Sequence, residues 1–266
     1  MANQGDSQGP RAGEPDAGTP GVEETSAREQ GVEGIGAAEV NARKKRIGVL
    51  GGTFDPIHYA HLALAEDVYH ELKLARIIFV PAGQPPHKMG YSITPVEQRV
   101  AMLEQAIAAN PHFALSLVDV RRAGPSYTVD TLRLLHEEQG ADSELYFIIG
   151  GDSLRDLPGW YDPAGVIARA MIVAVMRPGY AEPERSRSAL LARLPGLEQR
   201  LITVEGPRMD LSSTDLRQRV ATGRPITYQT PEVVETYILQ HGLYRPQTDE
   251  DRRGWKQRDA HATNAI

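Results

Sequence analysis

Short apolar runs and segments with helical spacing alternate along the middle of the chain. Consecutive apolar residues bounded by polar or turn-forming residues predict buried strands, at Arg46–Leu50, Arg76–Val80, Phe113–Val120, Leu145–Ile149, Ala170–Met176 and Leu201–Val204. Apolar positions three and four residues apart predict helices, at Ala60–Leu72, Pro95–Ala109, Thr128–Gln139, Thr214–Ala221 and Pro231–Gln240. This alternation is typical of a parallel sheet with helices on both faces. The predicted fold class is α/β, a doubly wound parallel sheet whose ligands bind at the carboxyl ends of the strands.

One of these helices carries a start signal. Thr94 is the expected N-cap, Pro95 lies in the first turn, and Glu97 follows at the position that completes a capping box.

Both ends of the chain lack this pattern. Residues 1–44 are rich in Gly, Ala, Glu, Pro and Ser, and in residues 246–266 Trp255 is the only large apolar side chain. Such segments bury too little apolar surface to offset the entropy lost on ordering. We therefore expect a disordered N-terminal tail at 1–44, one domain at 45–245 and a flexible C-terminal tail at 246–266.

Composition excludes several classes of function. The formal net charge of −6 disfavours non-specific nucleic-acid binding, which needs a basic surface. The absence of cysteine excludes disulfides, thiolate catalysis and cysteine-based zinc sites. No apolar run approaches the roughly 18 residues of a membrane span, and the first residues do not form a secretory signal. We expect a cytoplasmic protein that binds neither membrane nor nucleic acid, and a homo-oligomer is compatible with the sequence.

Two glycines end the first predicted strand, and two histidines begin the helix after it. Gly51 and Gly52 allow a sharp turn and a close approach of phosphate to the main chain. The segment matches neither G-x-G-x-x-G nor the P-loop pattern. His58 and His61 are three residues apart, so both imidazoles can lie on one helix face beside an anion-attracting N-terminus. That arrangement suits a phosphate that gains negative charge in a transition state.

Two other interpretations of the histidines stay open. They could hold a metal with Asp55 as a third ligand, although no further ligand set is evident, so we expect no metal site made by the protein alone. They could also be incidental residues of the helix.

Further motifs suggest a binding site for an aromatic phosphate compound. Lys88, in the segment PPHK, can meet a phosphate, or it can be a solvated surface lysine. Thr128, in SYTVDT, lies where a helix is expected to start. Capping of the free N–H groups there would be enough to explain a threonine without any ligand. Trp160 and Tyr161 are candidates for stacking on a planar ring, with a core tryptophan as the alternative.

Polar residues also follow later strands. Gly150 and Asp152 end the fourth predicted strand, where a carboxylate can bind ribose hydroxyls, help to hold Mg²⁺ or cap a helix. Arg177 ends the fifth and can reach a triphosphate. The hydroxyls of the segment 212–214 begin a helix, and Arg217 lies one turn further on the same side. Simple N-capping would explain only one of these hydroxyls.

Together these motifs resemble a known family. GGTFDPIHYAH resembles the first motif of the HxGH nucleotidyltransferases, with Ala60 at the usual glycine, and LSSTDLR resembles their ISSTxxR motif. With PPHK, SYTVDT, GGD, the GWY segment and a closing GLYR, the chain is most similar to the bacterial nicotinate-nucleotide adenylyltransferases over about Arg46 to Arg245. This resemblance implies a Rossmann-like fold and transfer of AMP from ATP to nicotinate mononucleotide, forming nicotinate adenine dinucleotide and pyrophosphate.

The resemblance also assigns roles. It implies electrostatic catalysis by His58, His61, Lys88 and Arg217, with Mg²⁺ accompanying ATP. ATP-binding residues would be Gly51, Gly52, Thr53, Phe54, Gly150, Asp152, Arg177, Ser212, Ser213 and Thr214. Nicotinate mononucleotide would lie against Lys88, Thr128, Trp160 and Tyr161. Two alternatives remain: the same reaction on phosphopantetheine or nicotinamide mononucleotide, and a nucleotide-binding sensor without catalysis.

Overall fold

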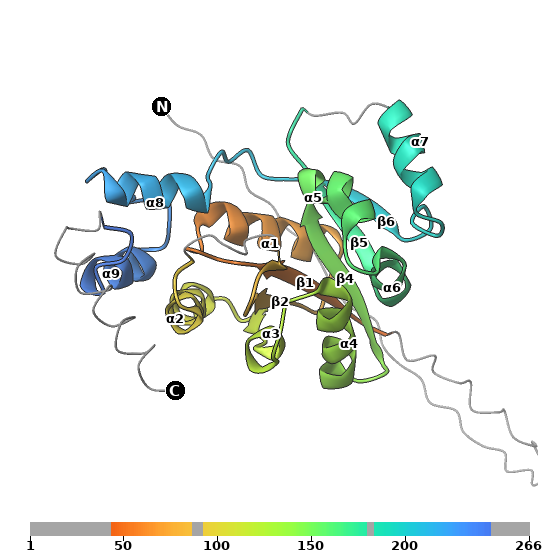
Figure 1. Ribbon diagram of the computed structural model, residues 1–266, viewed down its shortest axis with the longest axis horizontal. Helices are drawn as coiled ribbons and strands as arrows, with labels where there is room; N and C mark the ends of the chain where they lie inside the picture. The colour runs from red at the N-terminus through yellow and green to blue at the C-terminus, as the bar shows by residue number, and fades with distance from the viewer. Residues whose placement is uncertain (1–43, 87–92, 180–183, 246–266) are drawn as a thin grey trace, which may run out of the picture. The chain divides into compact units, whose positions relative to one another are not determined.

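A parallel sheet forms the centre of the molecule. The computed structural model describes residues 44–86, 93–179 and 184–245. Within these residues the sheet has six strands in the order β3-β2-β1-β4-β5-β6, and every neighbouring pair is parallel (Figure 1). The strands are β1 (Lys45–Gly52), β2 (Arg76–Pro81), β3 (Phe113–Leu115), β4 (Ser143–Gly150), β5 (Met171–Met176) and β6 (Leu201–Glu205). The predicted fold class is confirmed.

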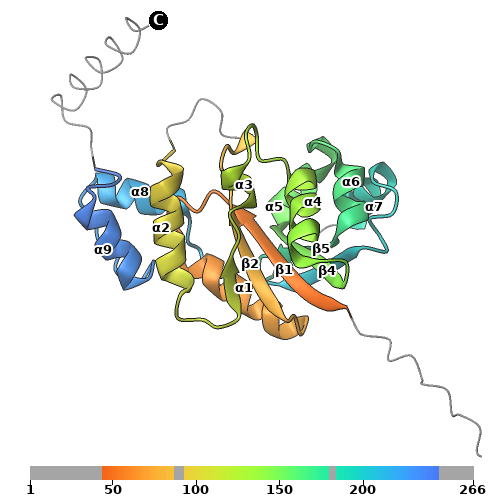
Figure 2. The same ribbon diagram turned by 90° about the horizontal axis from the view of Figure 1, so that it is seen from below.

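Helices cover both faces of this sheet (Figures 1 and 2). One face packs against α1 (Tyr59–Glu71), α2 (Val96–Ile107), α8 (Ser213–Ala221) and α9 (Glu232–Gln240). The other packs against α4 (Thr128–Gln139), α5 (Gly151–Asp156), α6 (Pro163–Arg169) and α7 (Glu184–Arg193), with the short helices α3 (Val118–Arg121) and η2 (Leu157–Gly159).

The central strands have continuous apolar stretches because successive side chains enter different cores. On β4, Leu145, Phe147 and Ile149 pack toward α4 and α6, while Tyr146 and Ile148 pack toward α1. Side chains alternate between the faces of a strand, so a strand buried on both faces has no polar position. This explains the continuous runs from which the strands were predicted.

The order of strands places a switch point between β1 and β4. From β1 the chain proceeds outward to β2 and β3, then returns to β4 on the other side of β1. β1 ends in Gly51 and Gly52, and β4 ends in Gly150, so these glycines lie at the same edge of the sheet. This is the edge at which doubly wound sheets bind ligands.

The strand predicted at Phe113–Val120 is wrong in its second half. β3 pairs with β2 only as far as Leu115, and residues 118–121 form α3. The turn into α3 places the carboxylate of Asp119 against the hydroxyl of Thr131 on α4. A buried carboxylate needs such partners, and a strand continued along the sheet edge would lose them.

The predicted capping box at Thr94 is also wrong. The N-cap of α2 is Pro95, and no side chain caps it, although Glu97 does lie in the first turn. The main chain of Thr94 has other partners: its N–H donates to Asp55, and its carbonyl accepts from Arg99. These contacts set the position of Thr94 at the helix start.

Four of the described helices were not among those predicted: α3, α5, α6 and α7. α6 begins at a clear signal, because Asp162 is its N-cap and accepts a hydrogen bond from the N–H of Gly165, with Pro163 at the first position. α7 spans Glu184–Arg193. The predicted tails, 1–44 and 246–266, lie outside the described residues apart from Lys44.

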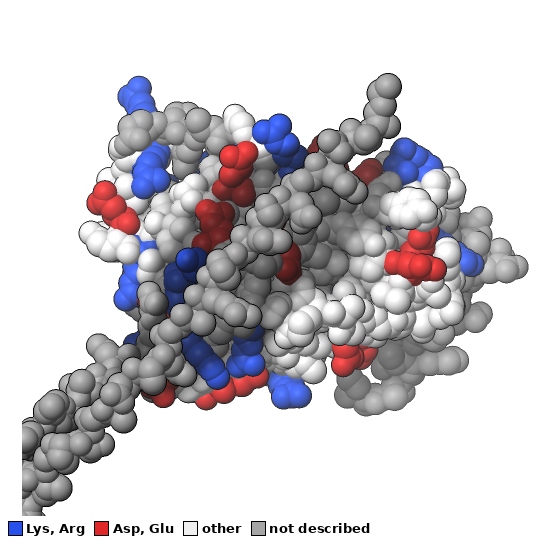
Figure 3. Space-filling model, turned by 180° about the vertical axis from the view of Figure 1, so that it is seen from behind, with Lys and Arg blue, Asp and Glu red and all other residues white. Residues whose placement is uncertain are grey.

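Acidic and basic side chains are interspersed on the described surface of the face shown in Figure 3. Among the helices that the structure describes, none has the length and apolarity needed to cross a membrane.

Candidate active site

Two cavities adjoin at the carboxyl edge of the sheet. The larger, about 680 Å³, is lined by the loop after β1, the loop after β2, the start of α4 and the segment after η2. The smaller, about 430 Å³, is lined by the ends of β4 and β5 and the first turns of α1. Leu64 and Gly150 line both cavities, so the two cavities are neighbours.

The residues predicted to bind the aromatic compound meet in the larger cavity. Thr128, Trp160 and Tyr161 all line it. Tyr161 is 62% exposed and stacks on Tyr127, with ring centroids 4.5 Å apart. Trp160 is half-buried and meets Phe147 edge-on, so it forms part of the core and part of the cavity wall.

The residues predicted to bind ATP are divided between the cavities. Residues 51–53 line the larger cavity, while Asp152 and Arg177 line the smaller. Asp152 is paired with Arg155 and lies 3.8 Å from Arg177. Phe54 is not at the wall of either cavity: its ring is buried and meets His61 edge-on.

The two predicted histidines are stacked, with ring centroids 3.7 Å apart. His58 is the N-cap of α1 and only 4% exposed, and its Nδ1 has no hydrogen-bond partner in the structure. Burial lowers the pKa of His58 from 6.5 to about 4, because the charged imidazole loses its hydration. His58 is therefore neutral near pH 7, and it lines neither of the two cavities.

His61 reaches the wall of the larger cavity. The main-chain N–H of His58 donates to Nδ1 of His61 at 3.3 Å. This bond makes Nδ1 an acceptor, so in the neutral ring Nε2 carries the proton. His61 is thereby prepared to donate a hydrogen bond from Nε2.

The loop before His58 is fixed by the C-terminal part of the domain. Three consecutive loop carbonyls accept side-chain hydrogen bonds: Asp55 from Arg217 (2.8 Å), Pro56 from Ser213 (2.8 Å) and Ile57 from Thr230 (2.7 Å). We call these three bonds the loop latch. They join two motifs that lie far apart in the sequence, and they hold the main chain that leads into His58.

The other hydroxyls at the start of α8 have local partners. Ser212 is the N-cap and accepts from the N–H of Asp215 at 3.1 Å, and Thr214 accepts from Arg217 at 3.3 Å. The capping interpretation is confirmed for Ser212. None of residues 212–214 lines either cavity, and Lys88 lies outside the described residues.

Comparisons with known proteins agree with this architecture. The model of the cytidylyltransferase-like family matches residues 49–219. A chain from Thermomicrobium roseum, described as a probable nicotinate-nucleotide adenylyltransferase, is 52% identical over 200 residues, which cover 75% of this chain and 92% of that one. A chain from Roseiflexus sp. with the same description is 54% identical over 199 residues, covering 75% and 98%.

The chain belongs to the cytidylyltransferase-like family, among its nicotinate-nucleotide adenylyltransferases. A solved structure, Plasmodium falciparum nicotinic acid mononucleotide adenylyltransferase complexed with NaAD, has the same fold. It is 21% identical with a TM-score of 0.60, and the match covers 75% of this chain and 97% of that one.

The sequence analysis did not identify the buried arginine Arg99 or the main-chain groups that it binds. Arg99 is 1% exposed and donates to three main-chain carbonyls, of Thr53 (2.7 Å), Ala82 (2.9 Å) and Thr94 (2.9 Å). It joins the loops after β1 and β2 to the start of α2. The sequence did hold a sign of this burial. Arg99 lies three and four residues before the core residues Met102 and Leu103, and so on the same face of α2.

Tyr244 was noted only as part of the closing GLYR. Its hydroxyl donates to Oδ1 of the buried Asp55 at 2.7 Å. Burial, then the charge of Asp55, raises the pKa of Tyr244 well above its ordinary value, so the hydroxyl remains a donor. Tyr244 lies beyond the residues that the family model matches.

The metal interpretation of the histidines finds no support in the site of this adenylyltransferase. Among the described residues, no three His, Asp or Glu side chains are grouped as ligands. The carboxylate of Asp55 instead accepts from Tyr244 and from the N–H of Thr94.

Proposed function

We propose that the chain transfers AMP from ATP to the phosphate of nicotinate mononucleotide, forming nicotinate adenine dinucleotide and pyrophosphate. The observation that carries this proposal is the pair of cavities that meet at Leu64 and Gly150, with His61 on the wall of the larger one. An adenylyl transfer needs two nucleotides bound with their phosphates in contact. Adjoining cavities beside a glycine turn and a helix start fit that need.

The larger cavity suits the acceptor. Trp160 and Tyr161 line this cavity and offer ring faces to the pyridine. We assign the nicotinate carboxylate to main-chain N–H groups from the family resemblance alone. Thr128, at the start of α4, faces the same space. We assign Lys88 to the acceptor phosphate from its motif alone.

The smaller cavity and the glycine turn suit ATP. Gly150, Asp152 and Arg177 line the smaller cavity, and residues 51–53 form the turn in the wall of the adjoining larger cavity. A Cβ at Gly52 would lie 3.0 Å from the Phe54 ring, so a larger residue there would require that ring to shift. Through the loop latch, the segment 212–214 and Arg217 lie next to this turn, and we assign them to the triphosphate.

The reaction proposed needs no covalent intermediate with the protein. An oxygen of the acceptor phosphate forms a bond to the α-phosphorus of ATP. The bond from that phosphorus to the bridging oxygen breaks, and pyrophosphate leaves with the electron pair. His61, donating from Nε2, and the neutral His58 beside it stabilise the charge on the α-phosphate.

Mg²⁺ is implied by the reaction, and the donor set fits a metal that arrives on ATP. Mg²⁺ usually keeps several waters and takes one or two carboxylates together with phosphate oxygens. Asp152 is the carboxylate on the wall of the smaller cavity and is largely exposed. When bound, the metal would neutralise charge on the phosphates.

Product analysis tests the proposal. The full chain is incubated with Mg-ATP and nicotinate mononucleotide, and the nucleotides are separated by chromatography. We expect nicotinate adenine dinucleotide and pyrophosphate in equal amounts. Unchanged ATP with this acceptor, together with adenylylation of phosphopantetheine, would overturn the proposal.

A further inference from the structure

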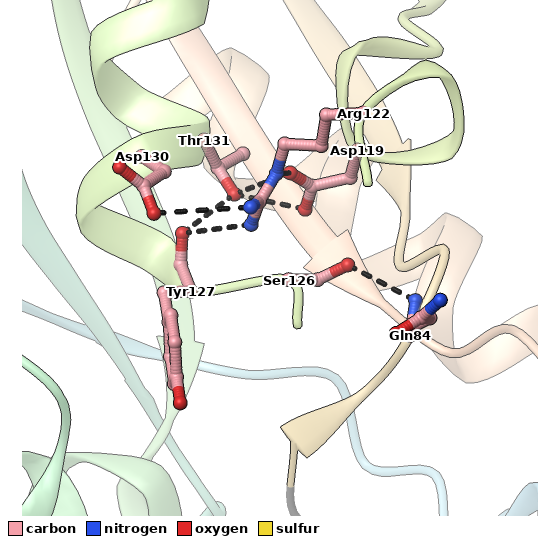
Figure 4. A network of polar contacts seen from close by, with 7 residues as sticks. All are labelled: Gln84, Asp119, Arg122, Ser126, Tyr127, Asp130 and Thr131. Carbon is pink, nitrogen blue, oxygen red and sulfur yellow. Dashed lines mark hydrogen bonds and ion pairs between the residues drawn. The ribbon is translucent and has the colours of Figure 1, made fainter. Parts of the chain in front are cut away.

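A buried carboxylate lies behind the wall of the larger cavity, and the mechanism above does not use it. Asp119, on α3, and Thr131, on α4, both line the cavity. The hydroxyl of Thr131 lies 2.9 and 2.8 Å from the two carboxylate oxygens of Asp119, and Nε of Arg122 donates to one of them at 2.9 Å (Figure 4). Only 6% of the Asp119 side chain is exposed.

Arg122 joins three groups from two helices. Besides Asp119, its guanidinium lies 3.8 Å from the carboxylate of Asp130 and 3.5 Å from the main-chain oxygen of Tyr127. The side chain of Arg122 is 18% exposed, so these contacts are largely shielded from water. They tie α3 to the first turn of α4.

Tyr127 carries this connection to the cavity. Figure 4 shows its carbonyl directed toward Arg122 and its ring directed away. That ring stacks on Tyr161, the exposed aromatic residue that we assign to the acceptor. The orientation of the Tyr127 main chain thus affects the position of the stacked Tyr127 and Tyr161 rings in the cavity.

The neighbouring loop is tied to the same segment. Ser126 donates its N–H to the carbonyl of Gln84 at 2.9 Å, and the N–H of Gln84 donates to the hydroxyl of Ser126 at 3.2 Å. A Cβ at Gly83 would lie 2.4 Å from the carbonyl oxygen of Asp119, so this loop also packs closely on α3. Two loops that border the cavity are therefore joined to each other, and one of them packs on α3.

We propose that Arg122 is a positioning residue for the acceptor nucleotide. It acts through the carbonyl of Tyr127 and the carboxylate of Asp119, and it keeps the Tyr127–Tyr161 pair at the cavity wall. This inference rests on the proposed function, since it takes nicotinate mononucleotide as the occupant of the larger cavity. A planar guanidinium donates in several fixed directions at once, which the ammonium of a lysine does not reproduce.

The test separates acceptor binding from ATP binding. Arg122→Met and Arg122→Lys are made in a Trp255→Phe background, which leaves Trp160 as the only tryptophan of the chain. The Kd for nicotinate mononucleotide is read from Trp160 fluorescence, and KM and kcat are measured for both substrates. We expect Arg122→Met to raise the Kd and KM for the acceptor about tenfold, because a displacement near 1 Å weakens positioning strongly. The KM for ATP stays within about twofold, and Arg122→Lys lies between wild type and Arg122→Met.

Arg133→Met is the matched control. Arg133 is on α4 and pairs with Glu137 at 2.8 Å, but both side chains are largely exposed. We expect wild-type constants for this variant, because an exposed pair contributes little. If Arg122→Met does not fold, Asp130→Asn removes only the outer partner of Arg122 and should raise the acceptor KM in the same direction by a smaller factor.

Activity of the background protein on nicotinate mononucleotide is measured first, so that failure of the proposed function is seen separately. Given that activity, equal rises in KM for ATP and acceptor, or a lower melting temperature with an unchanged acceptor Kd, would overturn the positioning role.

Discussion

Arg217 on α8 donates a hydrogen bond to the main-chain oxygen of Asp55, three residues before His58, at 2.8 Å. Ser213 makes the equivalent bond to Pro56, and Thr230 to Ile57. Hydrogen bonds from the second family motif therefore hold the loop of the first motif in position.

Loss of one latch bond should slow catalysis. Ser213→Ala removes the bond to Pro56 without changing charge. A hydrogen bond of this kind contributes about 1 kcal/mol, so we expect kcat to fall about fivefold. Thr222→Ala is the control, because that hydroxyl, at the other end of α8, bonds only to local carbonyls. Steady-state kinetics that give equal kcat values for both variants would argue against the latch.

Removal of the His61 side chain should affect turnover far more than folding. We expect His61→Ala to lower kcat by about 10²- to 10³-fold, as for other lost donors to a charged transition state. His70→Ala, on the same helix, removes an exposed ring paired with Glu66 and should leave kcat unchanged. A His61→Ala enzyme within about tenfold of wild type would contradict the role assigned to this ring.

The buried His58 should make stability depend on pH. Its pKa is 6.5 in the unfolded chain and about 4 in the folded one. Between these values only the unfolded chain binds the proton, so stability from this group is present above pH 6.5 and is lost as the pH falls toward 4. The loss amounts to about 3 kcal/mol.

Urea unfolding of wild type and His58→Asn at several pH values measures this loss. The difference in unfolding free energy between the two proteins should shift by about that amount in favour of the variant as the pH falls. A difference that stays constant from about pH 7 to about pH 4 would mean that His58 is not buried as described.

Substitutions in the two cavities should affect different substrates. Tyr161→Ala removes the partner of Tyr127 in the larger cavity, and we expect the acceptor KM to rise about two- to tenfold. Ala60→Val adds volume at the wall of the smaller cavity and should raise the KM for ATP about tenfold, since a filled cavity excludes its ligand. Each variant should leave the KM for the other substrate nearly unchanged. The reverse pattern would exchange the assignments of the cavities.

The sequence predicted the strands well where both faces are buried, because an apolar run such as Leu145–Ile149 is hard to interpret otherwise. The prediction from sequence failed where a polar side chain forms hydrogen bonds with residues that are distant in the sequence. β3 ends before Asp119, whose carboxylate accepts a hydrogen bond from Thr131. The carboxylate of Asp55 accepts from Thr94 and Tyr244. Such pairings are set by the three-dimensional packing, and no local pattern encodes them.

The candidate site was likewise predicted in part, for the residues that belong to short sequence motifs. Residues carried by short motifs, such as Trp160 and Tyr161, were found from the sequence and line one cavity. Arg99, Arg122 and Asp119 were not singled out, because each bonds to main-chain atoms or to another side chain and none belongs to a motif that the sequence analysis used. Phe54 was expected at ATP but is buried against His61.

Pyrophosphate release with Mg-ATP, compared between nicotinate and nicotinamide mononucleotides, tests the central claim most directly. The two acceptors differ only at the group that we place beside the main-chain N–H donors of the larger cavity. The account predicts rapid release with nicotinate mononucleotide and a kcat/KM at least about tenfold lower with the amide, since loss of a charge-assisted hydrogen bond costs more than 1 kcal/mol. Equal rates with both acceptors, or no release with either, would contradict it.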